Sequence, residues 1–397
     1  MQKVKQPFFI KGFAKINWVI VICVITLAIF GIVMIYSASS YNAEKNFGDS
    51  FYFVNKQIIG FVLGLGAMIF CYFFNYQLLQ KFMYPALILG LLVLGLVLIP
   101  GVGVELYGAK RWISVFGVSF QASEIAKFCF IIFASAYMAK YKDKMSHFFG
   151  ALPVLIVGTI MCVLIMLEPN MSITICMGVL MLTLLLIGGM RIKHFGLMAT
   201  PLVAVVPVLI LAEPYRMQRL MAFLDPWANP QGEGFQLIQS LYALGNGGFF
   251  GVGLFHSRQK YSFLPFSESD FIFSIIGEEL GFIGCVLLIA VFLTLIIVGY
   301  KIAVRSKDRL GCYLAVGITT ILAVQVLLNI AVVTGAVPPT GLPLPLISAG
   351  GTSLVVFMAG MGVLLNIYKQ SEMDSFAVEN ARTNPTFLPF LKKGINR

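Results

Sequence analysis

The sequence predicts an all-α, polytopic membrane protein with ten transmembrane helices and one large extracytoplasmic loop. Of its 397 residues, 59% are hydrophobic and only 11% are charged, and the mean hydropathy is +0.91. A soluble domain carries about 25% charged residues, and each membrane-spanning helix needs roughly 20 apolar residues. The composition therefore excludes a water-soluble globular protein, and the length leaves room for about ten spans with their loops.

Ten apolar segments approach the length of a bilayer crossing and are separated by charged or turn-forming stretches. In chain order, we expect spans at 17–40, 57–75, 83–100, 122–140, 148–168, 171–190, 194–213, 271–300, 310–337 and 345–368. Lysines precede the first segment, but it is too long for a signal peptide and no small-residue cleavage site follows. We therefore expect a retained first helix, and an even number of spans places both termini on one side of the membrane.

The distribution of basic residues predicts which side that is. Most of the 28 lysines and arginines fall on the side of the termini, so the positive-inside rule predicts a multi-pass protein of the cytoplasmic (plasma) membrane with both termini cytoplasmic. We expect one ten-helix membrane domain at residues 1–370, including the extracytoplasmic loop 214–270, and a cytoplasmic tail at 371–397. The net charge of +11 follows from this topology, and no nucleic-acid partner is expected.

Cysteine and histidine usage indicates no metal centre. The seven cysteines are scattered singly without a paired motif, and the three histidines share no ligand spacing. No protein-bound metal is predicted. No cofactor is required by these residues, and a divalent cation, Mg²⁺ or Mn²⁺, is left open.

Two outer segments stand out from ordinary connections. The segment 214–270 is far longer than the usual 12 to 15 residues, which is more often seen in functional or disordered loops. It mixes aromatics such as Trp227 with paired charges, whereas the shorter segment 101–121 holds Lys110 and Arg111 beside glycine-rich turns. Contact with lipid headgroups and membrane lipids is the alternative interpretation of both.

Ionisable residues inside the spans point to a central cavity. Glu124 and Lys127 lie three residues apart and so share one helix face. A charge inside the membrane costs about 2.5 to 3.5 kcal/mol even on the lenient insertion scale, so it normally faces a cavity or a partner. The alternative is an ion pair that snorkels to the interface. Glu278 and Glu279 point about 100° apart on a helix, so we expect only one, Glu278, to line the cavity.

Asp270 is the carboxylate that closes the long outer loop and precedes an apolar span. This position puts its carboxylate at the outer membrane surface and at a helix N-terminus, where one interpretation is a catalytic role. The structural alternative is an N-cap, because aspartate is a preferred capping residue and Ser267 stands at capping-box spacing before it.

Ordered motifs extend through both outer segments and the last loop. They are Gly108-Ala109-Lys110-Arg111-Trp112-Ile113, Gln121-Ala122-Ser123-Glu124-Ile125-Ala126-Lys127, Asp225-Pro226-Trp227, Gly234-Phe235-Gln236-Leu237-Ile238-Gln239-Ser240, Ser257-Arg258-Gln259-Lys260, Leu264-Pro265, Ser269-Asp270-Phe271-Ile272-Phe273, Gly277-Glu278-Glu279-Leu280-Gly281 and Pro338-Pro339-Thr340-Gly341-Leu342-Pro343-Leu344-Pro345-Leu346-Ile347-Ser348. Together these motifs resemble the SEDS family of cell-wall proteins, whose members are called RodA, FtsW and SpoVE. The run 338–341 and the segment 245–248 are more similar to the division and sporulation branch, FtsW and SpoVE.

The resemblance implies a peptidoglycan glycosyltransferase that polymerises lipid II at the outer membrane face with a class B penicillin-binding protein. Asp270 matches the family's essential aspartate and would be the general base, and the diphosphate leaving group needs cations. The expected substrate-binding residues are Lys110, Arg111, Arg216, Arg219, Arg258, Lys260 and Gln236. The expected central-cavity residues are Glu124, Lys127, Glu278 and Ser348.

Two other functions stay open at this level. A buried ion pair in a ten-helix protein also suits a lipid II flippase, and the chain could instead be a scaffold that recruits a penicillin-binding protein. One departure from the family pattern matters for the site: Glu168-Pro169-Asn170 stands where the family commonly has Gln-Pro-Asp.

Overall fold

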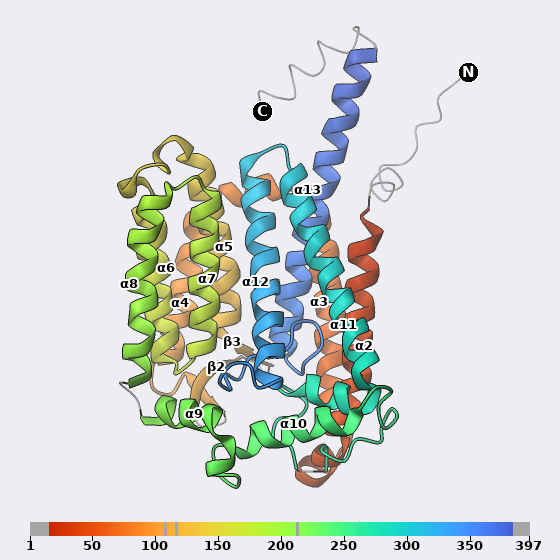
Figure 1. Cartoon of the computed structure of the whole chain (residues 1–397). Coiled ribbons are helices and arrows are strands. Elements are labelled where there is room, and N and C mark those ends of the chain that lie inside the picture. The colour runs from red at the N-terminus through yellow and green to blue at the C-terminus, as the bar shows by residue number, and fades with distance from the viewer. Residues whose placement is uncertain (1–15, 107–108, 116–117, 212–213, 262, 384–397) are drawn as a thin grey trace, which may run out of the picture.

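A computed structural model describes residues 16–106, 109–115, 118–211, 214–261 and 263–383. The long helices run side by side in one bundle, and two short helices of the long loop lie across one end of it (Figure 1). In chain order the helices are α2 (Trp18–Phe47), α3 (Tyr52–Phe73), η1 (Tyr76–Gln80), α4 (Met83–Leu98), α5 (Ala122–Lys140), η2 (Lys142–Lys144), α6 (Phe148–Leu167), α7 (Met171–Ile187), α8 (Ile192–Leu211), α9 (Pro214–Leu224), η3 (Pro226–Ala228), α10 (Phe235–Gly247), α11 (Ile272–Arg305), α12 (Arg309–Val333) and α13 (Gly351–Thr383).

A helix lies at each of the ten expected spans, which confirms the helical polytopic fold. Within the described residues, seven of these helices are long and apolar enough to cross a membrane: α2, α3, α5, α6, α11, α12 and α13. The helices α4 and α7 are apolar but shorter. The number of crossings therefore stays a prediction, while the segments themselves are found where expected because hydropathy selects them directly.

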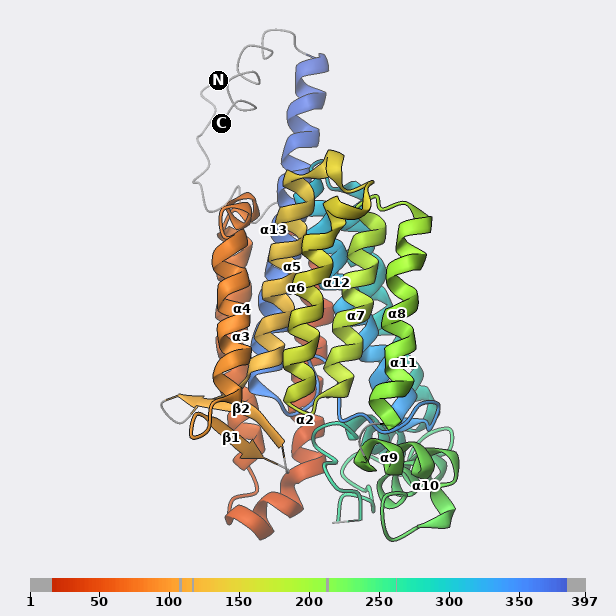
Figure 2. The same cartoon turned by 90° about the vertical axis from the view of Figure 1, so that its left-hand side faces the viewer.

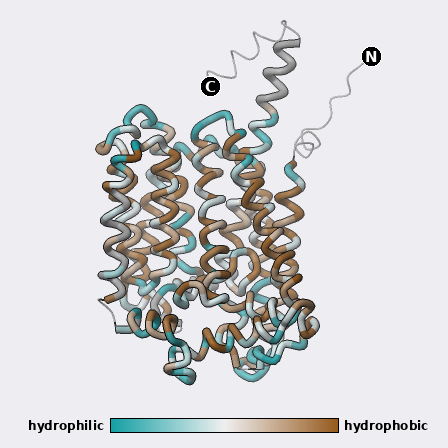
Figure 3. Tube along the Cα trace, viewed as in Figure 1, coloured by the Kyte–Doolittle hydropathy of each residue, from teal (hydrophilic) through white to brown (hydrophobic). Residues whose placement is uncertain are grey.

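Side-chain burial explains why these segments are so apolar. Their outward faces expose large hydrophobic residues such as Ile22, Val62 and Leu287, which need an apolar surrounding. Hydrophobic colouring runs along the length of the bundle and polar residues gather at its two ends (Figure 3). This is the pattern of a helix bundle in lipid, where every backbone group of a span is satisfied within its own helix.

The segment 101–121 folds differently from the expected connection. It forms a three-stranded antiparallel sheet of β1 (Gly103–Leu106), β2 (Ala109–Val115) and β3 (Val118–Gln121) in the order β1-β2-β3. Trp112 of the central strand pairs with both Val104 and Gln121. The sheet lies at the same end of the bundle as α9 and α10 (Figure 2), so we call this end the loop end.

The long outer segment is also more ordered than a plain loop. It contains α9, η3 and α10, and it reaches α11 through an irregular stretch, residues 248–271. The first residues of α2 and the last described turns of α13 lie at the end of the bundle opposite the loop end (Figure 1). The expected boundary between membrane domain and tail at residue 370 falls inside α13, which continues to Thr383.

Candidate active site at the loop end

Asp270 lies at the loop end, two residues before α11 begins, and its main chain is held from two directions. The Asn329 amide on α12 donates to the Asp270 carbonyl oxygen at 2.8 Å and to that of Leu342 at 2.7 Å. The Ser348 hydroxyl donates to the Ser269 carbonyl oxygen at 2.5 Å. These bonds fix the backbone of Asp270 and leave its carboxyl group to the site.

The helix cap of α11 is not Asp270. Its N-cap residue is Phe271, and no side chain caps the helix. The N-cap interpretation of Asp270 is therefore wrong, because the chain enters the helix one residue later than capping by Asp270 requires. Helix capping therefore does not explain why an aspartate stands at position 270, which favours a chemical role for its carboxyl group.

The Asp270 carboxyl group has a pKa well above the usual value for an aspartate. Its side chain is half-buried, and the loop 338–343 passes beside it: a Cβ atom placed on Gly341 would make an ordinary van der Waals contact with Oδ2, at 3.7 Å. Glycine suits position 341 because its φ is +72°. Burial raises the pKa of Asp270 to about 7 in total; the Glu268 charge also raises it, whereas a backbone hydrogen bond and the positive charges of Arg219 and Arg111 lower it. A carboxylate with a pKa near 7 is suited to accept a proton at neutral pH.

Two arginines contribute positive charge to the field at Asp270. Arg219 on α9 donates from Nη1 to the Pro339 carbonyl oxygen at 3.2 Å. Arg111 on β2 donates from Nε to the Glu168 carbonyl oxygen at 3.1 Å and from Nη2 to that of Pro169. Segments far apart in the sequence thus bring two positive charges near the carboxylate, and positive charge is what an anionic leaving group would need.

The other expected substrate-binding residues are placed unevenly. Arg216 lies on α9 three residues before Arg219, so both project from one face of that helix. Gln236 on α10 donates to the Pro265 carbonyl oxygen at 3.2 Å and thereby holds the loop that leads to Asp270. The side chain of Lys110 lies outside the described residues, and Arg258 is exposed.

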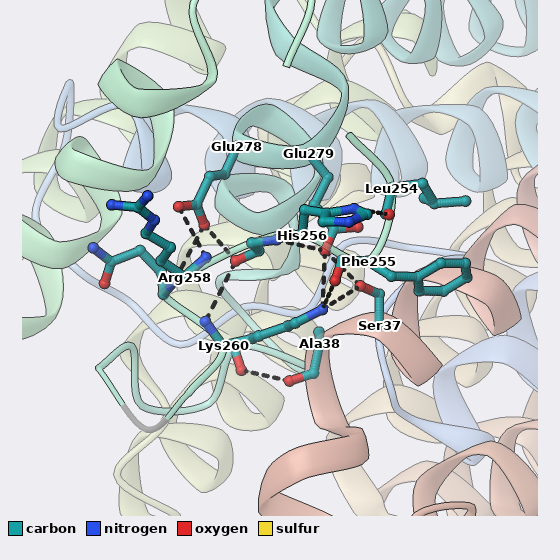
Figure 4. Close-up of polar contacts among 12 residues, drawn as sticks. Ser37, Ala38, Leu254, Phe255, His256, Arg258, Lys260, Glu278 and Glu279 are labelled. Atoms are coloured by element: carbon teal, nitrogen blue, oxygen red, sulfur yellow. Dashed lines mark hydrogen bonds and ion pairs between the residues drawn. The ribbon is translucent and has the colours of Figure 1, made fainter. Parts of the chain in front are cut away.

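The position of Lys260 corrects its predicted role. Its side chain is buried, and Nζ is 3.4 Å from Glu279 Oε1 and 2.6 Å from the Phe255 carbonyl oxygen (Figure 4). The ammonium group is buried and bound to these protein groups, so it does not face a substrate. We therefore do not assign Lys260 to the diphosphate.

Glu278 also differs from its expected place in a central cavity. It is fully buried, and its carboxylate accepts from the Ser257 hydroxyl and from the N–H groups of Arg258 and Gln259 at 3.2 and 3.3 Å. Its partners belong to the outer loop (Figure 4). Helix α11 is broken at Gly281, so both glutamates lie at the end of its first part, and the 100° spacing of an unbroken helix does not predict that both contact this loop.

Glu124 and Lys127 form a buried ion pair in α5. Both side chains are 0% exposed and are joined at 2.7 Å. Lys127 Nζ also donates to Gln325 Oε1 at 2.7 Å, and the Gln325 amide donates to the Pro343 carbonyl oxygen at 3.2 Å. The snorkelling alternative is wrong for this geometry, because the ammonium group is bonded inside the bundle. The pair supports the same loop, 338–348, that passes Asp270.

Ser348, Gln325 and Asn329 complete this support. Ser348 receives the Leu344 N–H on its hydroxyl at 2.8 Å, in addition to its bond to Ser269. Gln325 and Asn329 were not among the site residues predicted from the sequence. The signal was present, because two amide side chains four residues apart on one face of an apolar span require buried partners.

Glu168 is a second buried carboxyl group near Arg111. Its side chain is 0% exposed, and neither carboxylate oxygen has a hydrogen-bond partner among the described residues. Burial raises the pKa of Glu168 to about 8, and the nearby Arg111 charge lowers it only in part. Asn170, two residues later, caps α7 by accepting from the Ile173 N–H. In this chain the acidic residue thus stands before Pro169, where it is buried, and the residue after Pro169 is an asparagine that caps α7.

Replacing Glu168 by glutamine is expected to stabilise the protein only at high pH. The folded state raises the pKa of Glu168 from 4.5 to about 8, so the carboxyl group destabilises the fold increasingly as pH rises through that window. We expect an apparent Tm about 2–5 °C above wild type at about pH 8.5, and no difference near pH 5. The measurement is thermal unfolding in detergent, with the exposed Glu233→Gln as control; a gain that does not depend on pH would contradict this origin.

Fold and site together define a polytopic helical membrane protein with a carboxylate and cations gathered at one end of its bundle. The profile of the FtsW/RodA/SpoVE family, described as cell cycle protein, matches residues 17–373, and the chain belongs to this family. The resemblance to the SEDS proteins is thereby confirmed.

Curated relatives are similar over nearly the whole chain. A protein of Geobacter sulfurreducens named probable peptidoglycan glycosyltransferase FtsW is 38% identical over 362 residues, which cover 90% of this chain and 96% of the relative. Stage V sporulation protein E of Bacillus subtilis is 38% identical over 353 residues, covering 89% of this chain and 96% of the relative.

Solved structures share the fold. One, described as showing structural coordination of polymerization and crosslinking by a peptidoglycan synthase complex, has a TM-score of 0.74 and 27% identity and covers 90% of this chain and 98% of the other. The rod shape determining protein RodA of Thermus thermophilus has a TM-score of 0.66 at 23% identity, covering 90% of this chain and 97% of RodA, and supports the fold alone.

Proposed function

We propose that this protein is a peptidoglycan glycosyltransferase that polymerises lipid II into glycan strands at the outer face of the cytoplasmic membrane. The names of the full-length relatives support the activity. The observation that carries it is the carboxyl group of Asp270, whose pKa is raised to about 7 in the field of Arg219 and Arg111. A base and cations at one end of a membrane bundle match the needs of transfer from a lipid diphosphate.

The chemistry assigns a separate task to each kind of residue. Asp270 accepts the proton of the acceptor sugar hydroxyl while the hydroxyl oxygen forms a bond to the anomeric carbon of the donor. The bond between that carbon and the diphosphate oxygen breaks, and the configuration of the carbon inverts. The lipid diphosphate departs with its negative charge, which Arg111, Arg216 and Arg219 stabilise without protonating it.

Among the described residues, no three His, Cys, Asp or Glu side chains are grouped so as to hold a metal ion. A Mg²⁺ or Mn²⁺ ion carried by the diphosphate is a separate question, which parallel assays with EDTA and with added cation address.

The partner we propose is a class B penicillin-binding protein, which would cross-link the strands that this protein makes. A similar structure of 27% identity is a peptidoglycan synthase complex that coordinates polymerization and crosslinking. The relatives named FtsW and stage V sporulation protein E favour the division or sporulation branch.

The deciding experiment is polymerisation of labelled lipid II by the purified protein in liposomes, with and without its penicillin-binding partner. Glycan strands separated on a gel support the proposal. Transfer of lipid II between leaflets with no polymer under either condition would instead identify a flippase. Neither activity, together with tight binding of the partner, would identify a scaffold.

We further propose that the loop end is extracytoplasmic and that both termini are cytoplasmic. The basic residues favour this orientation. Gln231 in the segment 214–270 is exposed and is therefore a suitable site for a reporter. In a background without the seven native cysteines, Gln231→Cys should react with an impermeant maleimide on intact cells that lack an outer-membrane barrier.

The control for this labelling is Lys142→Cys, an exposed position near the opposite end of the bundle. It should react only after the cytoplasmic membrane is opened. The reverse pattern for the two cysteines would overturn the orientation.

A further inference from the structure

The first part of α11 ends in two buried carboxylates that face one stretch of the outer loop. Glu278 and Glu279 are each 0% exposed. Glu278 accepts from the Ser257 hydroxyl and from two backbone N–H groups, and Glu279 Oε1 accepts from the Ser257 N–H at 3.2 Å. Figure 4 shows both glutamates reaching the segment 254–260 from α11. Three of their four carboxylate oxygens accept hydrogen bonds from the protein, and the fourth, Glu279 Oε2, is buried without a partner among the described residues.

A buried ion pair extends these contacts to α2. Lys260 Nζ lies 3.4 Å from Glu279 Oε1 and 3.4 Å from the Ser37 hydroxyl. The Ser37 hydroxyl donates to Glu279 Oε1 at 2.6 Å. We call Ser37, Lys260 and Glu279 the loop anchor. It joins α2, the outer loop and α11 through charges that are withdrawn from solvent.

Backbone hydrogen bonds hold the outer loop against α11 beside the two glutamates. Helix α11 is interrupted at Gly281, whose φ is 67° and ψ is −167°. The N–H groups freed by this break, on Phe282 and Ile283, donate to the carbonyls of Gly248 and Phe249 at 2.9 and 3.2 Å. On the other side, the carbonyls of Glu278 and Glu279 each accept at 3.0 Å from the N–H groups of Val252 and Gly253. The loop therefore fills the break and satisfies its polar groups.

The same region of α2 also holds the segment that carries Asp270. Ala38, which follows Ser37, accepts at its carbonyl oxygen from the Ser267 hydroxyl at 3.2 Å. Consecutive residues of α2 thus bind the loop at Lys260 and at Ser267, three residues before Asp270. The position of Asp270 relative to the bundle depends on both attachments.

We propose that the loop anchor positions Asp270 for proton transfer and that Lys260 and Glu279 contact neither donor nor acceptor. This inference rests on the proposed role of Asp270 as the base. Displacing a reacting group by about 1 Å can cost about 100-fold in rate. Loss of the anchor should accordingly lower kcat for polymerisation and leave the KM for lipid II nearly unchanged.

The test compares Lys260→Met, Glu279→Gln, the double variant and Ser37→Ala in liposomes with labelled lipid II. Each charged single variant should lower kcat by about 10- to 100-fold with KM within about 3-fold of wild type. The double variant should regain at least about 5-fold over the worse single, since it leaves no unpaired buried charge. Lys45→Met, at an exposed lysine near the loop end of α2, is the matched control and should resemble wild type.

Hydrogen exchange provides a readout that does not need activity. The backbone amides of 257–260 should exchange faster in both charged single variants than in wild type, because their acceptors lose their position. If the wild-type protein makes no polymer, the proposed function fails while exchange still tests the anchor. If Lys260→Met does not fold, Ser37→Ala decides, with an expected 3- to 10-fold loss of kcat, about the value of one hydrogen bond, and faster exchange.

Three results would overturn the inference. One is a raised KM with unchanged kcat in Lys260→Met and no such effect in Glu279→Gln, which would make Lys260 a substrate ligand. Another is strict additivity of the two single variants. The third is wild-type kcat and wild-type exchange in Glu279→Gln or in Ser37→Ala.

Discussion

Asp270→Asn is expected to lower the rate of glycan polymerisation by about 10²- to 10⁴-fold while the protein stays folded. The amide has nearly the shape of the carboxylate but cannot accept the proton of the acceptor hydroxyl. The backbone bonds that hold this residue come from Asn329 and do not involve its side chain. The helix start does not depend on it either, since α11 has no side-chain cap. The loss therefore reports chemistry and not folding.

The measurement is polymer yield over time on a gel, with labelled lipid II and the partner present. Asp225→Asn is the matched control: Asp225 lies in the same outer segment, and its side chain accepts from the Trp227 N–H, a capping role that asparagine keeps. It should retain close to wild-type activity. Near-normal polymer from Asp270→Asn would reject the assignment of the base.

The pH profile supplies a second test of the same assignment. The base must be deprotonated, so the wild-type rate should rise with pH and reach half its maximum near the pKa of Asp270, about 7. The charge of Glu268 raises the pKa of Asp270, so Glu268→Gln should move the midpoint to lower pH. A midpoint that stays in place or moves to higher pH would contradict the coupling of these two carboxyl groups.

Lys127→Ala is expected to destabilise the protein by about 3–5 kcal/mol, because it leaves the Glu124 carboxylate buried without its cation. Both side chains are 0% exposed, so water does not replace the lost partner. The variant also removes the donor to Gln325, which holds the Pro343 carbonyl of the loop beside Asp270. Stability and polymerisation should therefore both fall.

Thermal unfolding in detergent measures the first effect, with an apparent Tm lower by about 5 °C or more. Lys45→Ala changes an exposed lysine and should have no effect on Tm. The double variant Glu124→Gln with Lys127→Met removes both charges and should recover most of the lost stability, as replaced buried pairs do. Equal Tm values for Lys127→Ala and Lys45→Ala would show that the pair contributes nothing in the folded protein.

The membrane fold could be predicted because lipid selects for a property of contiguous residues. A span must be apolar over its own length, so the ten segments were located without knowledge of any neighbour. Asp270 was singled out from its place at the end of the outer loop, and its proposed role as the base came from the resemblance of the surrounding motifs to the family. The sheet at 103–121 was missed, because its strands are short and its pairing is not local to one strand.

The interpretation of individual charges depended on partners that the sequence does not bring together. The sequence suggests that Lys260 is an unpaired cation of the loop. In the structure it forms an ion pair with Glu279 and a hydrogen bond with Ser37, which is 223 residues away. Lys127 donates to Gln325, which is 198 residues away in the sequence. This contact inside the bundle shows that the Glu124–Lys127 pair is buried and does not snorkel to the interface.

By itself, then, the sequence determined the helical membrane fold, the apolar segments and the carboxylate that we assign as the base, since each follows from residue type and local pattern. Only the tertiary structure decided that Asp270 is not a helix cap, that Arg111 and Arg219 approach it, and which charges serve the protein itself. The physical reason is that the effect of a charge depends on its distance from other groups and on its access to water. Both are set when helices pack, not along the chain.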